Sequence, residues 1–129
     1  MTQGSKPTVG SIAWTDLTVA DAQRLREFYA SVVGWQPEPV DMGGYSDFSM
    51  NASDGTATAG VCHARGSNAD LPAQWLIYIV VADLEQSLAR STDLGGEMVT
   101  PPRSLGASGR CCVIRDPAGA EAALYQPSR

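Results

Sequence analysis

The 129-residue sequence lacks the long apolar segments that mark membrane and secreted proteins. It has no run of about 18 apolar residues, the length that predicts a transmembrane helix. Its first eight residues contain no apolar core like that of a signal peptide. We therefore expect no membrane association and a cytoplasmic location. The chain is also too short for two independent domains, so we expect a single domain with a substantial core.

Basic residues and cysteines are scarce. The sequence has nine Lys and Arg residues and 14 Asp and Glu residues, which gives a net charge of −5. A negative chain without a stripe of basic residues opposes phosphate backbones, so we expect no nucleic-acid partner. The number of cysteines is odd: Cys62, Cys111 and Cys112. Adjacent residues of a strand point to opposite faces, which disfavours a disulfide between Cys111 and Cys112. Reduced thiols are the expected state.

The segment 12–35 changes its hydrophobic period from two to about 3.6, which predicts a strand that leads directly into a helix. Asp21 lies at the change and is placed to cap the helix, and Gly34 is placed to end it. The predicted apolar stripe of this helix comprises Ala22, Leu25, Tyr29 and Val32.

A second copy of this unit begins about 62 residues later, because Val19-Ala20-Asp21 recurs as Val81-Ala82-Asp83. Asp83 starts the second predicted helix, and Gly95-Gly96 follows it. The apolar residues of its predicted face are Leu84, Leu88 and Leu94. The chain therefore consists of a duplicated module.

Each module continues with three predicted strands. In module 1 (about 9–63) they are 35–40, 45–50 and 56–63; a polar linker covers 64–72. In module 2 (about 73–127) the predicted elements are a strand at 74–81, a helix at 83–94 and strands at 97–100, 110–115 and 120–126. We expect Pro101-Pro102 to end the strand at 97–100 and a flexible connection at 102–109.

The order βαβββ, found twice, resembles the vicinal oxygen chelate superfamily, which includes glyoxalase I, bleomycin-resistance and fosfomycin-resistance proteins and extradiol dioxygenases. The residues that carry the resemblance are Phe28-Tyr29, Val33-Gly34-Trp35 and Asp116-Pro-Ala-Gly119, and it spans about residues 9–127. With Trp14 and Asp16-Leu17, the pattern is most similar to small bacterial glyoxalase-like proteins. The resemblance implies a single α+β domain whose paired βαβββ modules form a curved mixed, mostly antiparallel sheet around a cavity.

In the enzymes that the sequence resembles, His, Gln and Glu side chains on the first and last strands of each module hold a divalent metal. Carried over, the first-strand positions fall on Trp14 and, within a residue, on Leu76. The last-strand positions fall on Ala123 and on Gly60 or its neighbour Ala59. None of these side chains coordinates a hard or borderline cation. The resemblance therefore implies a chain with no metal site and no cofactor.

Strand alternation extends this set to a candidate ligand site. If Trp14 and Leu76 face the cavity, so do Asp16, Gln74 and Tyr78, and around Ala123 the same alternation selects Glu121 and Tyr125. Such a pocket has aromatic walls and a few carboxylates, which suits an aromatic or cationic ligand. In the other interpretation, Asp16 and Glu121 are solvated charges at strand ends. The only histidine, His63, is interpreted as a strand-end residue next to a structural thiol.

These observations favour a metal-free protein that binds a small molecule, with an aromatic or cationic natural product as ligand. The alternative is an enzyme of the same superfamily, a lyase, isomerase or dioxygenase that uses a cavity carboxylate or an unrecognised metal site. An interaction module without a cavity function is a third interpretation. A homodimer is expected, because superfamily members of this size commonly pair and because Trp35 lies near a proline-interrupted sheet edge.

Overall fold

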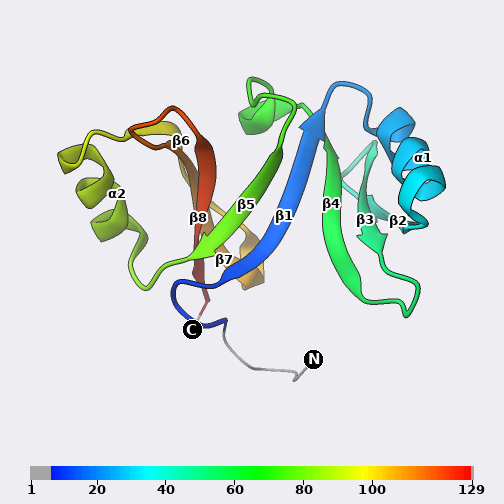
Figure 1. The fold of residues 1–129 in the computed structure, drawn as a ribbon, viewed down its shortest axis with the longest axis horizontal. Coiled ribbons are helices and arrows are strands. Elements are labelled where there is room, and N and C mark those ends of the chain that lie inside the picture. Colours follow the sequence, from blue (N-terminus) through cyan, green and yellow to red (C-terminus); the bar gives the residue numbers. More distant parts are fainter. Residues whose placement is uncertain (1–6, 129) are drawn as a thin grey trace. The chain divides into compact units, whose positions relative to one another are not determined.

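The computed structural model describes residues 7–128 and contains two compact units. The N-terminal unit is Trp14–Trp75, and the C-terminal unit is Leu76–Arg129 with the segment that ends at Ala13. Each unit combines one helix with a four-stranded mixed sheet (Figure 1). The predicted α+β class and the duplicated βαβββ order are confirmed.

The N-terminal unit has the strand order β2-β3-β4-β1. Strand β1 is parallel to β4, and the pairs β2–β3 and β3–β4 are antiparallel. Helix α1 follows β1 directly and packs against the other three strands. The elements are β1 (Ile12–Val19), α1 (Ala22–Val33), β2 (Gln36–Asp41), β3 (Ser46–Asn51) and β4 (Ala57–His63).

The C-terminal unit repeats this plan with the order β5-β8-β7-β6. Strand β5 is parallel to β8, and β8–β7 and β7–β6 are antiparallel. The elements are β5 (Trp75–Val80), α2 (Leu84–Asp93), β6 (Glu97–Ser104), β7 (Gly109–Arg115) and β8 (Glu121–Pro127). Two short 3₁₀ turns complete the chain, η1 (Gly66–Asn68) in the predicted linker and η2 (Gly106–Ser108) before β7.

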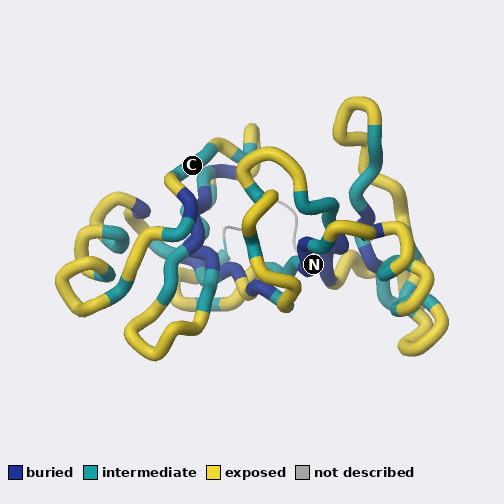
Figure 2. The backbone as a smooth tube through the Cα atoms, turned by 90° about the horizontal axis from the view of Figure 1, so that it is seen from above, coloured by how far each residue is buried: buried dark blue, intermediate teal, exposed yellow. Residues whose placement is uncertain are grey.

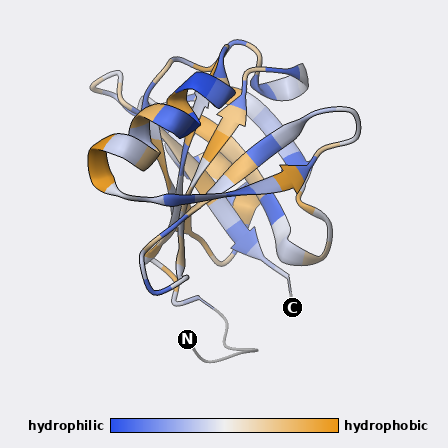
Figure 3. Cartoon of the chain, turned by 90° about the vertical axis from the view of Figure 1, so that its right-hand side faces the viewer, coloured by the Kyte–Doolittle hydropathy of each residue, from blue (hydrophilic) through white to orange (hydrophobic). Residues whose placement is uncertain are grey.

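Each helix covers its own small core. Under α1 the buried residues are Ala22, Phe48, Met50 and Val61, and under α2 they are Leu84, Cys112 and Leu124. Most buried residues belong to strands, whereas the residues of the loops and helices are mainly exposed (Figure 2). Apolar residues are likewise concentrated on the strands (Figure 3). Burial of these apolar side chains is the main driving force for packing each helix on its sheet.

Both predicted helix caps are present. The Asp21 carboxylate accepts a hydrogen bond from the Arg24 N–H at 3.1 Å, and the Asp83 carboxylate accepts one from the Gln86 N–H at 3.0 Å. Gly34 ends α1 in the left-handed conformation with φ of 77°, which a residue with a Cβ adopts at a cost. The duplicated Val-Ala-Asp segment thus starts a helix in each unit.

Two residues of the predicted helix stripes are not core residues. Val32 is 62% exposed near the end of α1, and Leu94 is 76% exposed at the C-terminal cap of α2. The sheets do not cover the last turn of either helix, so helical periodicity placed both side chains on a face that has no packing partner there.

Strand β6 continues through Pro101 and Pro102, so the prediction that these prolines end it is wrong. It lies at the end of its sheet, where one side of the strand needs no ladder donor. Register shifts occur on both sides of Thr100, and the Thr100 hydroxyl accepts a hydrogen bond from the Val113 N–H at 3.0 Å. This side-chain bond satisfies Val113 where the ladder is irregular. The predicted flexible connection is accordingly part strand and part 3₁₀ turn.

No disulfide joins the three cysteines, all of which lie in the described part of the chain. Between residues 7 and 128, no helix is both long and apolar enough to cross a bilayer.

Candidate functional site

In the N-terminal unit, Trp14 and Asp16 form a hydrogen-bonded pair on β1. The indole Nε1–H donates to Asp16 Oδ1 at 2.5 Å, and both residues are half-buried. Asp16 lies opposite Gly60 of β4 in the parallel register. A Cβ at Gly60 would overlap Asp16 Oδ1 and stand 3.4 Å from Trp14 Nε1. Glycine is therefore the residue that makes room for the indole–carboxylate pair.

This pair lies on the sheet face opposite α1. Leu17 pairs with Val61, which belongs to the core under α1, so Leu17 shares the helix-covered face. Side chains alternate along a strand, which directs Trp14 and Asp16 to the other face. The register also selects Gly60 over Ala59 as the partner of the first strand, an alternative that the sequence left open.

In the C-terminal unit the equivalent face is mainly apolar. Tyr78 pairs with Ala123 across β5 and β8, and both are buried. Leu76 precedes Tyr78 by two residues and is 5% exposed. Leu124 belongs instead to the core under α2, so its neighbour Ala123 faces away from that helix. The superfamily ligand positions of this unit thus hold a leucine and an alanine.

Glu121 is a largely buried carboxylate at the start of β8. Its side chain is 10% exposed, and Oε2 forms an ion pair with the Arg115 guanidinium at 3.0 Å. Oε1 is buried and has no hydrogen-bond partner among residues 7–128. Arg115 also contacts Glu97 at 3.5 Å. Glu121 and Asp16 are therefore both partnered carboxylates, and the side chain of Glu121 is largely shielded from solvent.

The two remaining predicted site residues differ in how firmly they are held. The Tyr125 hydroxyl donates to the Ser108 carbonyl at 2.6 Å, which fixes the ring against η2. Gln74 precedes the first residue of β5 and is exposed. Strand alternation therefore does not determine where the Gln74 side chain points.

Three contacts of these residues were not expected from the sequence. They involve Gly60 under Asp16, Arg115 beside Glu121 and Ser108 at the Tyr125 hydroxyl. Only the second had a signal in the sequence: Arg115 and Glu121 flank the Asp116-Pro-Ala-Gly119 turn, and hairpin register makes them partners. The other two depend on register between distant segments.

The buried Cys112 is not an activated nucleophile. Cys112 lies in the core under α2, where burial, helped by the adjacent Cys111 thiol, raises its pKa from 9.0 to about 11. Deprotonation is thus disfavoured, and the thiolate is the reactive form of cysteine.

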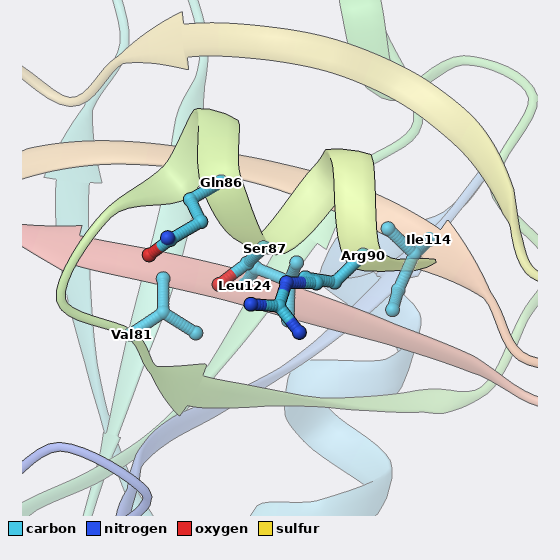
Figure 4. Close-up of a pocket in the computed structure, with 6 residues that line it drawn as sticks. All are labelled: Val81, Gln86, Ser87, Arg90, Ile114 and Leu124. Carbon is cyan, nitrogen blue, oxygen red and sulfur yellow. The ribbon is translucent and has the colours of Figure 1, made fainter. Parts of the chain in front are cut away.

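A hollow of about 330 Å³ lies beside α2 (Figure 4). Gln86, Ser87 and Arg90 from the helix line it together with the apolar side chains of Val81 and Leu124. It has a single charged group, and Arg90 is exposed. The hollow contains none of the predicted site residues and no cluster of chemically reactive groups.

The chain resembles known proteins over nearly its whole length. Residues 14–125 match the family described as the glyoxalase-like domain. A Mycobacterium tuberculosis protein named "Putative glyoxylase CFP32" is 32% identical over 100% of this chain and 50% of its own length. The anthracycline biosynthesis protein DnrV of Streptomyces peucetius is 32% identical over 91% of this chain and 47% of its own length. The chain therefore spans about half the length of these relatives.

Solved structures show the same fold at lower identity. A methylmalonyl-CoA epimerase of Streptomyces coelicolor has a TM-score of 0.58 at 18% identity and covers 95% of this chain and 100% of its own. The methylmalonyl-CoA epimerase of Mycobacterium tuberculosis has a TM-score of 0.56 at 20% identity and covers 98% of this chain and 95% of its own. Family match and fold agree: the chain belongs to the glyoxalase-like domain family of the vicinal oxygen chelate superfamily.

Proposed function

We propose that this chain binds a small planar aromatic or cationic natural product without using a metal. The observation that carries the proposal is the Trp14–Asp16 pair, which occupies β1 where the metal enzymes of the superfamily place a ligand. The indole offers a stacking surface, and the carboxylate offers an acceptor for a cationic or proton-donating group.

The donor set supports the metal-free part of the proposal. The four positions carried over from the metal enzymes hold Trp14, Gly60, Leu76 and Ala123, none of which has a side-chain donor suited to Zn²⁺, Ni²⁺, Mn²⁺ or Fe²⁺. Within residues 7–128, no three His, Cys, Asp or Glu side chains come close enough to share an ion. Asp16 is the carboxylate nearest these positions in the N-terminal unit, and it accepts the indole N–H.

The relatives support the choice of ligand class. DnrV, and DauV from Streptomyces sp. at 30% identity, are named anthracycline biosynthesis proteins. An anthracycline combines a planar polycyclic chromophore with an amino sugar, so it has both properties that an indole–carboxylate pair suits. An anthracycline is therefore the first probe for this chain.

Calorimetric titration of an anthracycline into wild type, Trp14→Ala and Asp16→Asn tests the proposal. Stacking of a base on an aromatic side chain contributes roughly 1–3 kcal/mol, so by analogy Trp14→Ala should weaken binding about five- to 150-fold. Asp16→Asn should weaken binding only if the amino sugar contacts this carboxylate. Trp35→Phe is the control, because Trp35 packs against Tyr29 and Trp75 in another cluster. Equal affinity of folded Trp14→Ala and wild type would contradict the proposal.

Glu121 is the observation that favours the alternative, an enzyme of the same superfamily acting as a lyase, isomerase or dioxygenase. A carboxylate oxygen without a hydrogen-bond partner has a free lone pair, and a general base needs such a lone pair to accept a proton from a substrate. The alternative also includes an enzyme that uses an unrecognised metal site. Elemental analysis distinguishes such an enzyme from a metal-free binder. We expect well below one metal per chain; a stoichiometric metal whose removal abolishes activity would favour the enzyme.

We also propose a homodimer. Two copies of this chain together match the length of one relative such as DnrV, of which a single copy covers about half. Trp35, which suggested a partner surface from the sequence, is half-buried against Tyr29 and Trp75. The support therefore comes from the relatives and from the exposed apolar residues Phe28 and Val32 of α1. The cytoplasmic location remains a prediction.

A further inference from the structure

A second hollow lies on the helix-covered side of the N-terminal unit, between α1 and the ends of β3 and β4. Its volume is about 380 Å³, within the range of small-molecule sites. The lining residues that matter for its chemistry are Arg26, Tyr45, Ser46, Phe48 and His63. Figure 1 shows α1 beside the strands β2, β3 and β4 that supply the other walls.

This hollow is separate from the site of the proposed function. Val19 pairs with His63, and Leu17 with Val61, so His63 shares the face of the core residue Val61. Phe48 also pairs with Val61. Trp14 and Asp16 alternate with these residues and lie on the opposite face. A ligand in this hollow would therefore not contact the Trp14–Asp16 pair.

Arg26 gives the hollow a cation with donors to spare. Its guanidinium carbon lies 4.9 Å from the centroid of the Phe48 ring, and it forms no ion pair with any of residues 7–128. By contrast, Arg110 and Arg115 are paired with glutamates. A guanidinium that lies over an aromatic ring can still use its N–H groups to bind an oxyanion in a bidentate manner.

His63 is held in place by a carboxylate. Asp47 Oδ1 accepts the His63 backbone N–H at 2.9 Å and lies 3.3 Å from the ring nitrogen Nδ1. Hydrogen bonding at Nδ1 leaves Nε2 as the ring nitrogen for a ligand. The ring also meets Tyr45 edge-to-face at a centroid distance of 5.6 Å, and the Arg65 guanidinium lies 3.9 Å from the Tyr45 centroid. The imidazole thus has a fixed orientation at a partly apolar wall.

We propose that this hollow binds a small organic carboxylate with an apolar or aromatic group. Arg26 would bind the carboxylate, the hydroxyl of Ser46 would donate to it, and Phe48, Tyr45 and the ring of His63 would contact the apolar part. No Asp or Glu side chain lines the hollow itself, and the neighbouring Asp47 carboxylate is engaged with His63.

Titration of benzoate and of inorganic phosphate, followed by backbone and side-chain NMR shifts, tests this site. We expect saturable benzoate shifts at Arg26 and His63 and weaker binding of phosphate, which gains nothing from Phe48 and Tyr45. Arg26→Gln should raise the benzoate Kd at least about tenfold, because it removes a charge-assisted hydrogen bond. His63→Gln should raise it by a smaller factor.

Arg24→Gln is the matched control, since it removes the same charge from an exposed position of the same helix. It should leave the benzoate Kd within about twofold, as expected for a screened surface charge. Trp14→Ala should also leave benzoate binding unchanged, which separates this site from the anthracycline test. Tighter binding of phosphate than of benzoate, equal weakening by Arg24→Gln and Arg26→Gln, or no saturation at all would overturn the proposal. Thermal unfolding checks that each variant is folded.

Discussion

At the scale of single residues, the hydrogen-bond and ion-pair partners of Asp16 and Glu121 determine which role suits each carboxylate. Asp16 accepts the Trp14 indole N–H, which fixes its orientation on β1. Glu121 shares one oxygen with Arg115 and keeps the other buried without a partner in the described chain. Asp16 is therefore suited to a recognition role, whereas Glu121 carries the enzymatic alternative.

The buried Cys112 thiol leads to a prediction about stability in alkali. Its folded-state pKa of about 11 is above the ordinary value of 9.0, because burial disfavours the thiolate. The neutral thiol therefore adds stability that is complete below pH 9 and is lost as the pH rises to about 11. Over this window the free energy of unfolding should fall by roughly 1–2 kcal/mol through this group alone.

Denaturant unfolding of wild type and Cys112→Ala between pH 8 and about 11 measures this contribution. The variant is expected to be less stable at pH 8, because it leaves a cavity in the core under α2. Its stability should nevertheless decline less steeply with pH. Parallel curves would show that Cys112 does not titrate differently in the folded and unfolded states.

At the scale of elements, the sequence predicts the features that depend on interactions between residues close together in the chain. The helix starts at Asp21 and Asp83 follow from capping chemistry, and the alternation that placed Tyr78 and Ala123 on one face agrees with the strand register. The course of β6 through Pro101 was not predictable, because it depends on which strand lies at the sheet end and on the Thr100–Val113 bond.

The candidate site shows the same difference between features that local sequence predicts and features that depend on distant segments. Alternation selected residues of one face, but Gly60 below Asp16 and Ser108 at Tyr125 come from segments far apart in the sequence. The sequence predicts a strand-end histidine at His63, because adjacent strand residues face opposite ways and Cys62 therefore cannot join it in one site. Its contacts with Asp47 and Tyr45 depend on the pairing of β3 with β4 and on the turn before β3.

The caps also provide a prediction at this scale. Asp21→Ala and Asp83→Ala should each lower the free energy of unfolding by about 1 kcal/mol, because each removes one side-chain hydrogen bond to the first helical turn. Asp21→Asn and Asp83→Asn are the controls, since asparagine caps nearly as well. Chemical denaturation measures all four variants. An alanine variant as stable as its asparagine counterpart would show that the cap contributes nothing in that helix.

At the scale of the whole molecule, the relatives raise the question of how many copies work together. The relatives are about twice as long as the part of them that this chain covers. In the chain itself, α1 exposes two large apolar residues one turn apart, Phe28 at 52% and Val32 at 62%. Exposed apolar neighbours on a helix are typical of a surface that another chain covers.

We therefore predict a homodimer in which α1 contributes to the interface. Light scattering coupled to size exclusion should give about twice the chain mass of 13.6 kDa at micromolar concentration. Phe28→Ser with Val32→Ser should weaken the dimer about a hundredfold or more, because each apolar side chain contributes about 1.5–3 kcal/mol when buried. Met98→Ser is the matched control, since Met98 is 53% exposed on β6 of the C-terminal unit. A wild type that stays monomeric would refute the dimer, and a dimer that survives the double substitution would place its interface away from α1.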